Sequence, residues 1–167
     1  LSDNLAQLNV ERYQQWTTET TEQRAKQAIL AFRGDVYAGM EATAFEQQDF
    51  DFAQQHLRIL SGLYGLLRPL DMIQPHRLEM GTRLENSRGK DLYAYWKSEN
   101  APLINRAVKE AGGPIVNLAS NEYFSSVESP QLESPVVTPV FKDEKSGVYK
   151  VISIYAKKAR GMMCDFV

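Results

Sequence analysis

Residues 60–69 read Leu60-Ser61-Gly62-Leu63-Tyr64-Gly65-Leu66-Leu67-Arg68-Pro69, a strongly apolar stretch that two glycines and one proline interrupt. Glycine tolerates backbone conformations that other residues avoid, and proline ends a helix because it lacks an N–H group and its ring clashes with the preceding turn. The stretch follows a segment with helical spacing. It therefore predicts a sharp helical hairpin or bend at this point of the chain.

Helical patterns account for most of the first 60 residues. Apolar residues recur at helical intervals over Ser2–Trp16, where Ser2 or Asp3 fits the N-cap position. Good helix formers fill Glu22–Phe32, and a further apolar stripe runs over Phe45–Leu60. We expect a helix or a bent helical pair in the first of these segments, a helix in each of the other two, and a short extended or turn segment at residues 35–40.

Strand patterns appear mainly in the second half. Polar and apolar residues alternate over Pro75–Leu84, which predicts a half-buried strand, and the apolar run Pro114–Ala119 predicts a buried one. Two β-rich runs at 136–141 and 148–155 predict a hairpin, because a polar turn with a glycine joins them. Helices are expected at 90–97, at 101–111 and from 156 onward. The predicted fold class is α+β, a mixed β-sheet with surrounding helices.

Length and composition indicate a single domain without disulfides. The 167 residues suffice for one domain of ordinary size. Cys164 is the only cysteine, and its distance in sequence from His56 and His76 leaves no metal-ligand spacing, so no cofactor is expected. No stretch approaches the ~18 consecutive apolar residues of a membrane span. We expect a cytoplasmic protein with no membrane partner.

The net charge of −2 conceals an uneven distribution. Residues 1–60 carry five basic and nine acidic side chains, whereas residues 61–167 carry 14 and 12. A strongly basic domain is the usual footprint of nucleic acid binding, and this chain is not one. Any anion site must therefore be a local cluster of cations.

Cations that suit such a cluster lie in the second half of the chain. A basic run at 157–160 follows an apolar strand, a place where functional side chains commonly emerge. Positive charges there suit phosphate groups, but a solvated helix face explains the run equally well. Three arginines further upstream add to the same surface if the fold brings them together. The candidate phosphate-binding residues are Arg68, Arg77, Arg83, Lys157, Lys158 and Arg160.

Standard catalytic signatures are absent from the sequence. It has no phosphate-binding loop, no nucleophile elbow, no paired cysteines and no dinucleotide fingerprint. Cys164 fits either a reactive thiol beside the basic run or, more commonly, a small core residue. His56 lies on the polar side of a predicted helix, and His76 has no carboxylate partner in sequence. Catalysis therefore finds no positive support in the residues.

Several long motifs resemble the YaaA family of bacterial peroxide-stress proteins. They are Ala31–Tyr37, Leu60–Asp71, Arg77–Gly81, Asn117–Phe124 and Tyr155–Gly161, and the resemblance covers essentially all 167 residues. It implies a cytoplasmic protein linked to survival of hydrogen peroxide by limiting free intracellular iron and hence oxidative DNA damage. It also implies DNA binding by an unusual α+β fold with a positively charged cleft and a helix-hairpin-helix element. No catalytic reaction is settled for the family.

Two segments are candidates for the helix-hairpin-helix element, which presents backbone N–H groups to a DNA phosphate from a tight hairpin between two helices. Leu5–Arg12 has the apolar spacing, but Gln7 stands where glycine is usual. Leu60–Gly65 has both glycines, with one extra residue between them. Family members also extend beyond both ends seen here. The chain is thus expected to be the central part of a longer domain.

Two functions from different classes follow from these observations. The first is a DNA-binding protein of the response to hydrogen peroxide, with double-stranded DNA as the partner and the six cations as phosphate contacts. The alternative is an enzyme acting on nucleic acid or a phosphorylated small molecule, in which Glu79, Glu122 or Asp71 supplies acid–base chemistry beside the cations. Direct iron binding would need a cluster of carboxylates and histidines, for which His56 and His76 give little support.

Overall fold

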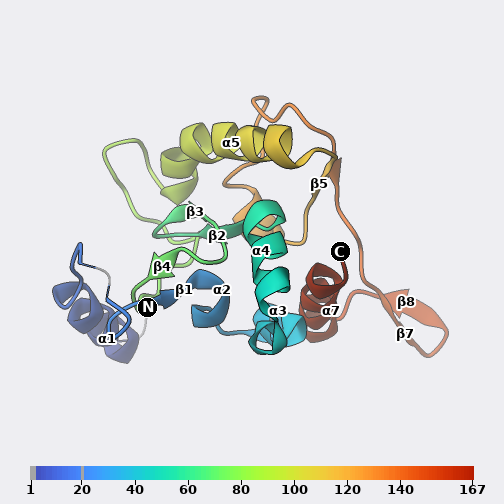
Figure 1. Cartoon of the computed structure of the whole chain (residues 1–167), viewed down its shortest axis with the longest axis horizontal. Helices are drawn as coiled ribbons and strands as arrows, with labels where there is room; N and C mark the ends of the chain where they lie inside the picture. Colours follow the sequence, from blue (N-terminus) through green and yellow to red (C-terminus); the bar gives the residue numbers. More distant parts are fainter. Residues whose placement is uncertain (1–2, 20) are drawn as a thin grey trace.

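The computed structural model describes residues 3–19 and 21–167, so the expected N-cap at Ser2 lies outside the described residues. Helices and short strands are interspersed along this part of the chain (Figure 1). The helices are α1 (Asp3–Gln14), α2 (Ala28–Ala31), α3 (Asp35–Met40), the 3-10 helix η1 (Ala42–Ala44), α4 (Gln47–His56), α5 (Leu92–Ala111), α6 (Asn121–Phe124) and α7 (Ser153–Phe166). The strands are β1 (Lys26–Gln27), β2 (Ile59–Ser61), β3 (Gly65–Leu67), β4 (Met72–Ile73), β5 (Ile115–Val116), β6 (Val136–Val137), β7 (Asp143–Lys145) and β8 (Val148–Lys150).

The strands of the described chain form four separate two-stranded sheets. Three pairs are antiparallel, namely β1–β4, β2–β3 and β7–β8, and β5–β6 is parallel with Ile115 opposite Val136. The predicted α+β class is confirmed, with both strand directions present but divided among small pairs. In Figure 1, α5 crosses the top of the molecule and the β7–β8 hairpin projects from the side that carries α7.

The apolar stretch at 60–69 forms a β-hairpin, so the predicted helical hairpin was wrong. Ser61 at the end of β2 lies opposite Gly65 at the start of β3. The Ser61 hydroxyl oxygen accepts hydrogen bonds from the backbone N–H groups of Leu63 and Tyr64 at 3.3 and 3.2 Å. Such side-chain bonds favour a turn over a helix, and Gly65 adopts a φ of 73° that lets the chain return as a strand.

Two predictions in the first half were also wrong. Within the helix predicted at 22–32, only the single turn α2 is helical, because β1 just before it is held extended by pairing with β4. Residues 35–40, predicted as extended or turn, form the helix α3. A six-residue helix is marginal by itself, and α3 depends on its packing against α7.

The segment 75–84, predicted as a strand, contains no strand in the structure. Side chains from other elements bond to its backbone in place of a neighbouring strand. The Asn9 amide donates to the Arg77 carbonyl at 3.0 Å, and the Gly81 N–H group donates to Glu122 Oε1 at 2.9 Å. The alternating polar and apolar residues therefore lie in a segment whose backbone bonds to side chains and not to a neighbouring strand.

Most of the predicted helices are confirmed. The first lies within α1, and α4 starts at a reciprocal pair of bonds between Glu46 and Asp49. The helices predicted at 90–97 and 101–111 are one continuous helix, α5, which runs through Pro102 and is capped by the Asp91 side chain. Helix α7 begins at Ser153, slightly before the predicted start.

The hairpin predicted near the C-terminus is confirmed at its turn but not in both of its strands. Residues 143–145 and 148–150 pair as β7 and β8 across Ser146 and Gly147. The run 136–141 was expected to supply the first strand. Its first two residues instead form β6 and pair with β5, which confirms a strand within the run predicted at 114–119 but not its burial, because Val116 is 42% exposed.

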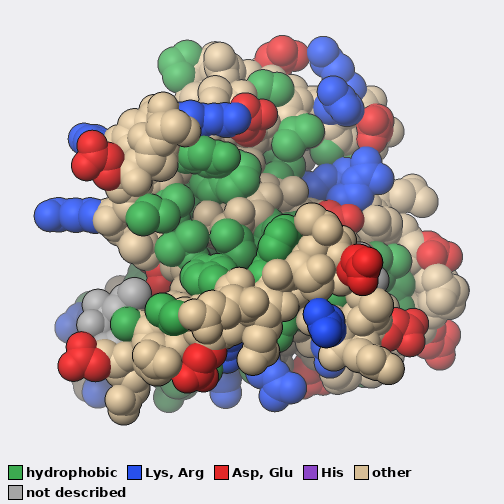
Figure 2. Space-filling view, turned by 90° about the vertical axis from the view of Figure 1, so that its left-hand side faces the viewer, with side chains coloured by type: hydrophobic (Ala, Val, Ile, Leu, Met, Phe, Trp, Pro, Cys, Tyr) green, Lys and Arg blue, Asp and Glu red, His purple; other side chains and the backbone are tan. Residues whose placement is uncertain are grey.

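A hydrophobic core joins the first half of the chain. Buried residues from α2, α3, η1 and β2–β4 make up this cluster, and partly buried side chains such as Phe32, Tyr37 and Cys164 pack against it. Figure 2 views the molecule from the left-hand side of Figure 1 and shows hydrophobic side chains gathered in the middle of that face, with charged ones around them. None of the described helices combines the length and the apolar character needed to cross a bilayer.

Two glycines bring α3 and α7 into backbone contact. Gly39 of α3 lies against the Lys158 carbonyl group, and Gly161 of α7 lies against the Val36 carbonyl group. A Cβ atom at either position would overlap the facing carbonyl oxygen. The close approach of these helices thus requires glycine at both places.

We expect Gly161→Ala to destabilise the protein. Alanine is the better helix former by about 1 kcal/mol, so at an exposed helical site this change would raise the free energy of unfolding. At position 161 the added methyl group would overlap the Val36 carbonyl. The change should therefore lower the free energy of unfolding by about 2 kcal/mol or more. Urea denaturation followed by circular dichroism measures this difference.

Met162→Ala is the matched control on the next residue of α7, whose side chain is 63% exposed. Its free energy of unfolding should change by less than about 0.5 kcal/mol. Stabilisation by Gly161→Ala would contradict the close packing of α3 and α7.

Candidate functional site

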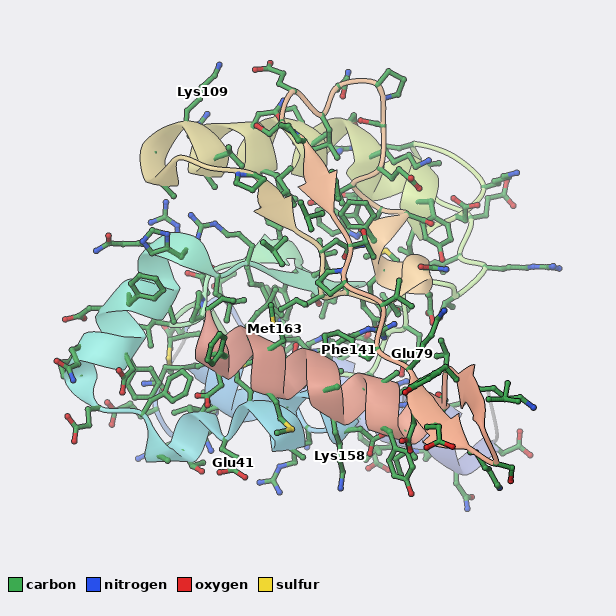
Figure 3. All side chains as sticks on the ribbon, turned by 90° about the vertical axis from the view of Figure 1, so that its right-hand side faces the viewer. Glu41, Glu79, Lys109, Phe141, Lys158 and Met163 are labelled. Carbon is green, nitrogen blue, oxygen red and sulfur yellow. The ribbon has the colours of Figure 1, made fainter. Side chains whose placement is uncertain are left out.

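A cleft of about 1840 Å³ lies among elements from both halves of the chain. Its lining comes from the α2–α3 connection, β2, the segment after β4, α6 and the face of α7 that carries Lys157, Arg160 and Cys164. Figure 3 views the molecule from the side of α7 and shows the labelled Glu79 above that helix. Small-molecule pockets usually measure about 300–1,000 Å³, so the volume suits a larger ligand.

Charged side chains of both signs line the cleft, so it is not uniformly basic as the family resemblance implied. The basic residues are Arg12, Arg24, Lys26, Arg33, Arg58, Arg77, Lys157 and Arg160. The acidic residues are Glu22, Asp35, Glu41, Asp49, Glu79, Glu122 and Asp165.

Half of the cations predicted from sequence come together in this cleft. Arg77, Lys157 and Arg160 all line it. Arg77 Nε lies 3.4 Å from Glu79 Oε1, and Lys157 Nζ lies 3.6 Å from Asp35 Oδ2, which links α7 to α3. Arg160 forms no ion pair within the described part of the chain.

The other predicted cations do not line the cleft. Arg68 follows β3, and its guanidinium group lies 3.9 Å from Glu110 of α5. Arg83 is exposed in the segment before α5. Lys158 is exposed on α7 and extends away from Glu79 in Figure 3. The structure therefore separates these three from Arg77, Lys157 and Arg160.

Arg12 and Arg33 line the cleft but were not among the predicted site residues. Arg33 is exposed in the short connection between α2 and α3. Arg12 comes from the last turn of α1. The motif at 31–37 contained a signal for Arg33, because a charged residue beside a glycine between two apolar runs is typical of a functional loop. No local signal marks Arg12.

The three carboxylates of the enzyme hypothesis have different surroundings. Glu79 and Glu122 line the cleft. Glu79 Oε2 accepts a hydrogen bond from the Tyr123 hydroxyl at 2.7 Å, while Glu122 accepts from the Gly81 N–H group. Asp71 lies outside the cleft and accepts from the Arg68 N–H group at 2.7 Å, which fixes the turn after β3.

His76 supports the β2–β3 hairpin from the floor of the cleft. Its Nδ1 lies 2.9 Å from the Gln74 carbonyl oxygen and therefore carries the hydrogen, which leaves Nε2 to accept from the Ser61 hydroxyl at 3.4 Å. Burial lowers the pKa of His76. The hydrogen bond to the Gln74 carbonyl raises this pKa, and the positive charge of Arg12 lowers it. The neutral ring and the 2%-exposed Ser61 thus hold the turn together.

Neither candidate segment forms a helix-hairpin-helix element. Leu5–Arg12 lies inside the continuous helix α1, and Leu60–Gly65 joins two strands. The apolar spacing of the first segment reflects one straight helix. In the second, side-chain bonding to the backbone produces a strand turn.

Cys164 behaves as a core residue. It packs against the hydrophobic core beside Tyr37. Burial raises the pKa of the Cys164 thiol to about 11, and the neighbouring Asp165 charge acts in the same direction. A protonated thiol is a poor nucleophile, so Cys164 fits a small core residue better than a reactive thiol.

The raised pKa predicts that Cys164 reacts slowly in the folded protein. A rise from 9.0 to about 11 lowers the thiolate fraction at pH 8 about 100-fold, since only the thiolate attacks. A chromogenic aromatic disulfide should therefore label the native protein at least that much more slowly than the urea-unfolded chain. Equal rates in the two states would contradict the burial of this thiol.

Among residues 3–19 and 21–167, no group of three or more His, Cys, Asp or Glu side chains is arranged to hold a metal ion. The lining of the cleft instead offers guanidinium groups, carboxylates and aromatic rings. These groups bind by hydrogen bonds, ion pairs and stacking.

The fold and the site together define an α+β protein with a large cleft of mixed charge. The family model described as peroxide stress protein YaaA matches residues 1–167, and the chain belongs to this family. A UPF0246 protein of Teredinibacter turnerae is 55% identical over 168 residues, a match that covers 100% of this chain and 66% of that relative. The resemblance inferred from the motifs is confirmed.

Proposed function

We propose that this chain serves the cellular response to hydrogen peroxide by binding DNA in the cleft and protecting it from oxidative damage. Membership of the peroxide stress protein family supports the stress role. The cleft lining supports the DNA partner. Double-stranded DNA is held through its phosphate groups by Arg12, Arg33 and Arg160, and by Arg77 and Lys157 once phosphate displaces their ion pairs with Glu79 and Asp35.

The observation that carries the proposal is the pairing of charges in the cleft. Arg12, Arg33 and Arg160 form no ion pair with any described residue. Of the seven acidic side chains that line the cleft, Asp35 and Glu79 are engaged by a cation, and the other five form no ion pair with a described residue. The guanidinium groups therefore remain available, and guanidinium is the side chain best suited to pair with phosphate oxygens.

The available cations come from three separate elements. Arg12 ends α1, Arg33 lies between α2 and α3, and Arg160 lies on α7. Phosphate contacts supplied by several elements fix the orientation of a nucleic acid without reading its sequence. Binding by this cleft is thus proposed to be independent of duplex sequence.

Limitation of free intracellular iron belongs to the same proposal and rests on the family resemblance alone. Its route is tested separately by incubating the purified chain with ferrous iron and desalting it under anaerobic conditions. Iron retained in stoichiometric amount would indicate direct binding. Iron lost on desalting would indicate an indirect route.

We expect duplex binding to be strongly salt-dependent. Each phosphate neutralised by a cation contributes about −0.9 to the slope of log affinity against log salt. Arg160→Ala should weaken binding at low salt and make the slope shallower by about one. Fluorescence anisotropy titrations of a labelled duplex at a series of salt concentrations measure both quantities.

Lys158→Ala is the matched control, because Lys158 is an exposed cation of the same helix that does not line the cleft. For Lys158→Ala, the slope of log affinity against log salt should equal that of the unaltered chain. The absence of duplex binding at low salt would refute the proposed function. If Arg160→Ala and Lys158→Ala weakened duplex binding equally, the placement of the DNA in the cleft would be refuted.

A further inference from the structure

Glu79 places a negative charge on the surface proposed to bind phosphates. Its side chain is 52% exposed and lines the cleft beside Arg77. The ion pair with Arg77 offsets part of this charge, but a carboxylate still repels phosphate and weakens simple backbone binding. Its position therefore points to a ligand group that donates hydrogen bonds.

The Glu79 carboxylate is held in one orientation by groups from two elements. Oε1 lies 3.4 Å from Arg77 Nε, and Oε2 accepts from the Tyr123 hydroxyl of α6 at 2.7 Å. The backbone around it is also fixed, because Gly62 packs against the Leu78 carbonyl group and the Gly81 N–H group is bonded to Glu122. A fixed acceptor is suited to recognition because little order is lost on binding.

The carboxylate has acceptor capacity left. An ionised carboxylate offers about four lone-pair sites, and Arg77 and Tyr123 occupy one on each oxygen. One site on each oxygen thus remains for further donors, and the half-exposed side chain leaves these sites within reach of the cleft. Phosphate and sugar oxygens of a DNA backbone cannot donate to them, whereas the amino group of a base can.

We propose that Glu79 reads the amino group of an unpaired base, so that the cleft accommodates, besides duplex DNA, a single-stranded segment with cytosine, adenine or guanine in preference to thymine. The inference rests on the proposed function, since the cations of the cleft hold the phosphates of the same strand. Acidic side chains accept from the cytosine N4 amino group in known DNA readout. The aromatic rings of Tyr123 and Phe124 line the cleft and suit unpaired bases, which stack on such rings.

Thymine is the natural contrast to cytosine. The two pyrimidines are similar in size and in stacking, so the cleft must separate them by hydrogen bonding. Cytosine presents the N4 amino donors, whereas thymine presents the O4 acceptor at the same place. That oxygen would face the Glu79 carboxylate and be repelled, so unpaired thymine is left with its N3–H group as the one donor on this edge.

The test compares labelled oligo-dC and oligo-dT of about 12 nucleotides, a length within the range of single-strand binding sites. Fluorescence anisotropy at neutral pH and low salt gives the two dissociation constants. We expect oligo-dC to bind about fivefold more tightly or better, the lower end for one well-placed base contact. Glu79→Gln should bring the ratio of the oligo-dT and oligo-dC dissociation constants close to one. The affinity for oligo-dT should stay equal or rise, because a charge that repels the strand is removed.

Two further variants make the test specific to Glu79. Glu99→Gln removes a carboxylate that pairs with Arg88 at 2.7 Å outside the cleft, and it should leave the ratio unchanged. Tyr123→Phe removes the hydrogen bond to Oε2 but keeps the ring, so the ratio should fall only in part. Circular dichroism confirms that each variant is folded.

Different results would overturn different parts of the inference. Equal, salt-dependent binding of oligo-dC and oligo-dT by the unaltered chain would overturn base reading and leave the proposed function standing. An unchanged ratio in Glu79→Gln, with both affinities raised alike, would show that the carboxylate only repels the strand and would also overturn base reading. No binding of single strands or duplex would overturn the proposed function and base reading with it.

Discussion

The backbone contact between α3 and α7 determines much of this molecule. Because Gly39 and Gly161 have no side chains, the two helices approach closely enough for each to touch a carbonyl group of the other. This approach places Lys157 next to Asp35 and directs Arg160 to the cleft, while Cys164 packs against the core. One side of the cleft thus depends on two glycines that belong to no recognised motif for binding.

The opposite side of the cleft depends on a similar contact. Gly62 in the β2–β3 turn packs against the Leu78 carbonyl group, and its own carbonyl accepts from the Trp96 side chain of α5 at 2.9 Å. Helix α5 therefore holds the hairpin, and the hairpin holds the segment that carries Arg77 and Glu79. The charged groups project from a supported backbone even though this segment forms no strand.

Helical propensity and spacing allowed α1, α4, α5 and α7 to be predicted, although in α1 the apolar side chains Leu8, Val10 and Tyr13 are exposed and the buried residue is Asn9. The β2–β3 hairpin was missed because hydrogen bonds of a single hydroxyl, that of Ser61, decide its turn. Helix spacing also explains why only two of the three cations in the basic run at 157–160 line the cleft. Lys157 and Arg160 are three residues apart and share one face of α7, whereas Lys158 points elsewhere. Arg12 and Arg33 reach the cleft only through tertiary structure.

The mixed charge of the cleft lining has a kinetic consequence. Eight basic and seven acidic side chains line it, so their formal charges nearly cancel at a distance. Long-range attraction of a polyanion is then weak, and association should proceed at a rate closer to about 10⁵–10⁶ M⁻¹s⁻¹, typical of unsteered encounters, than at the diffusion limit. Guanidinium groups still act once a phosphate is within contact range. Under the proposed function, discrimination between nucleic acids would then occur after the encounter, in how long each one stays bound.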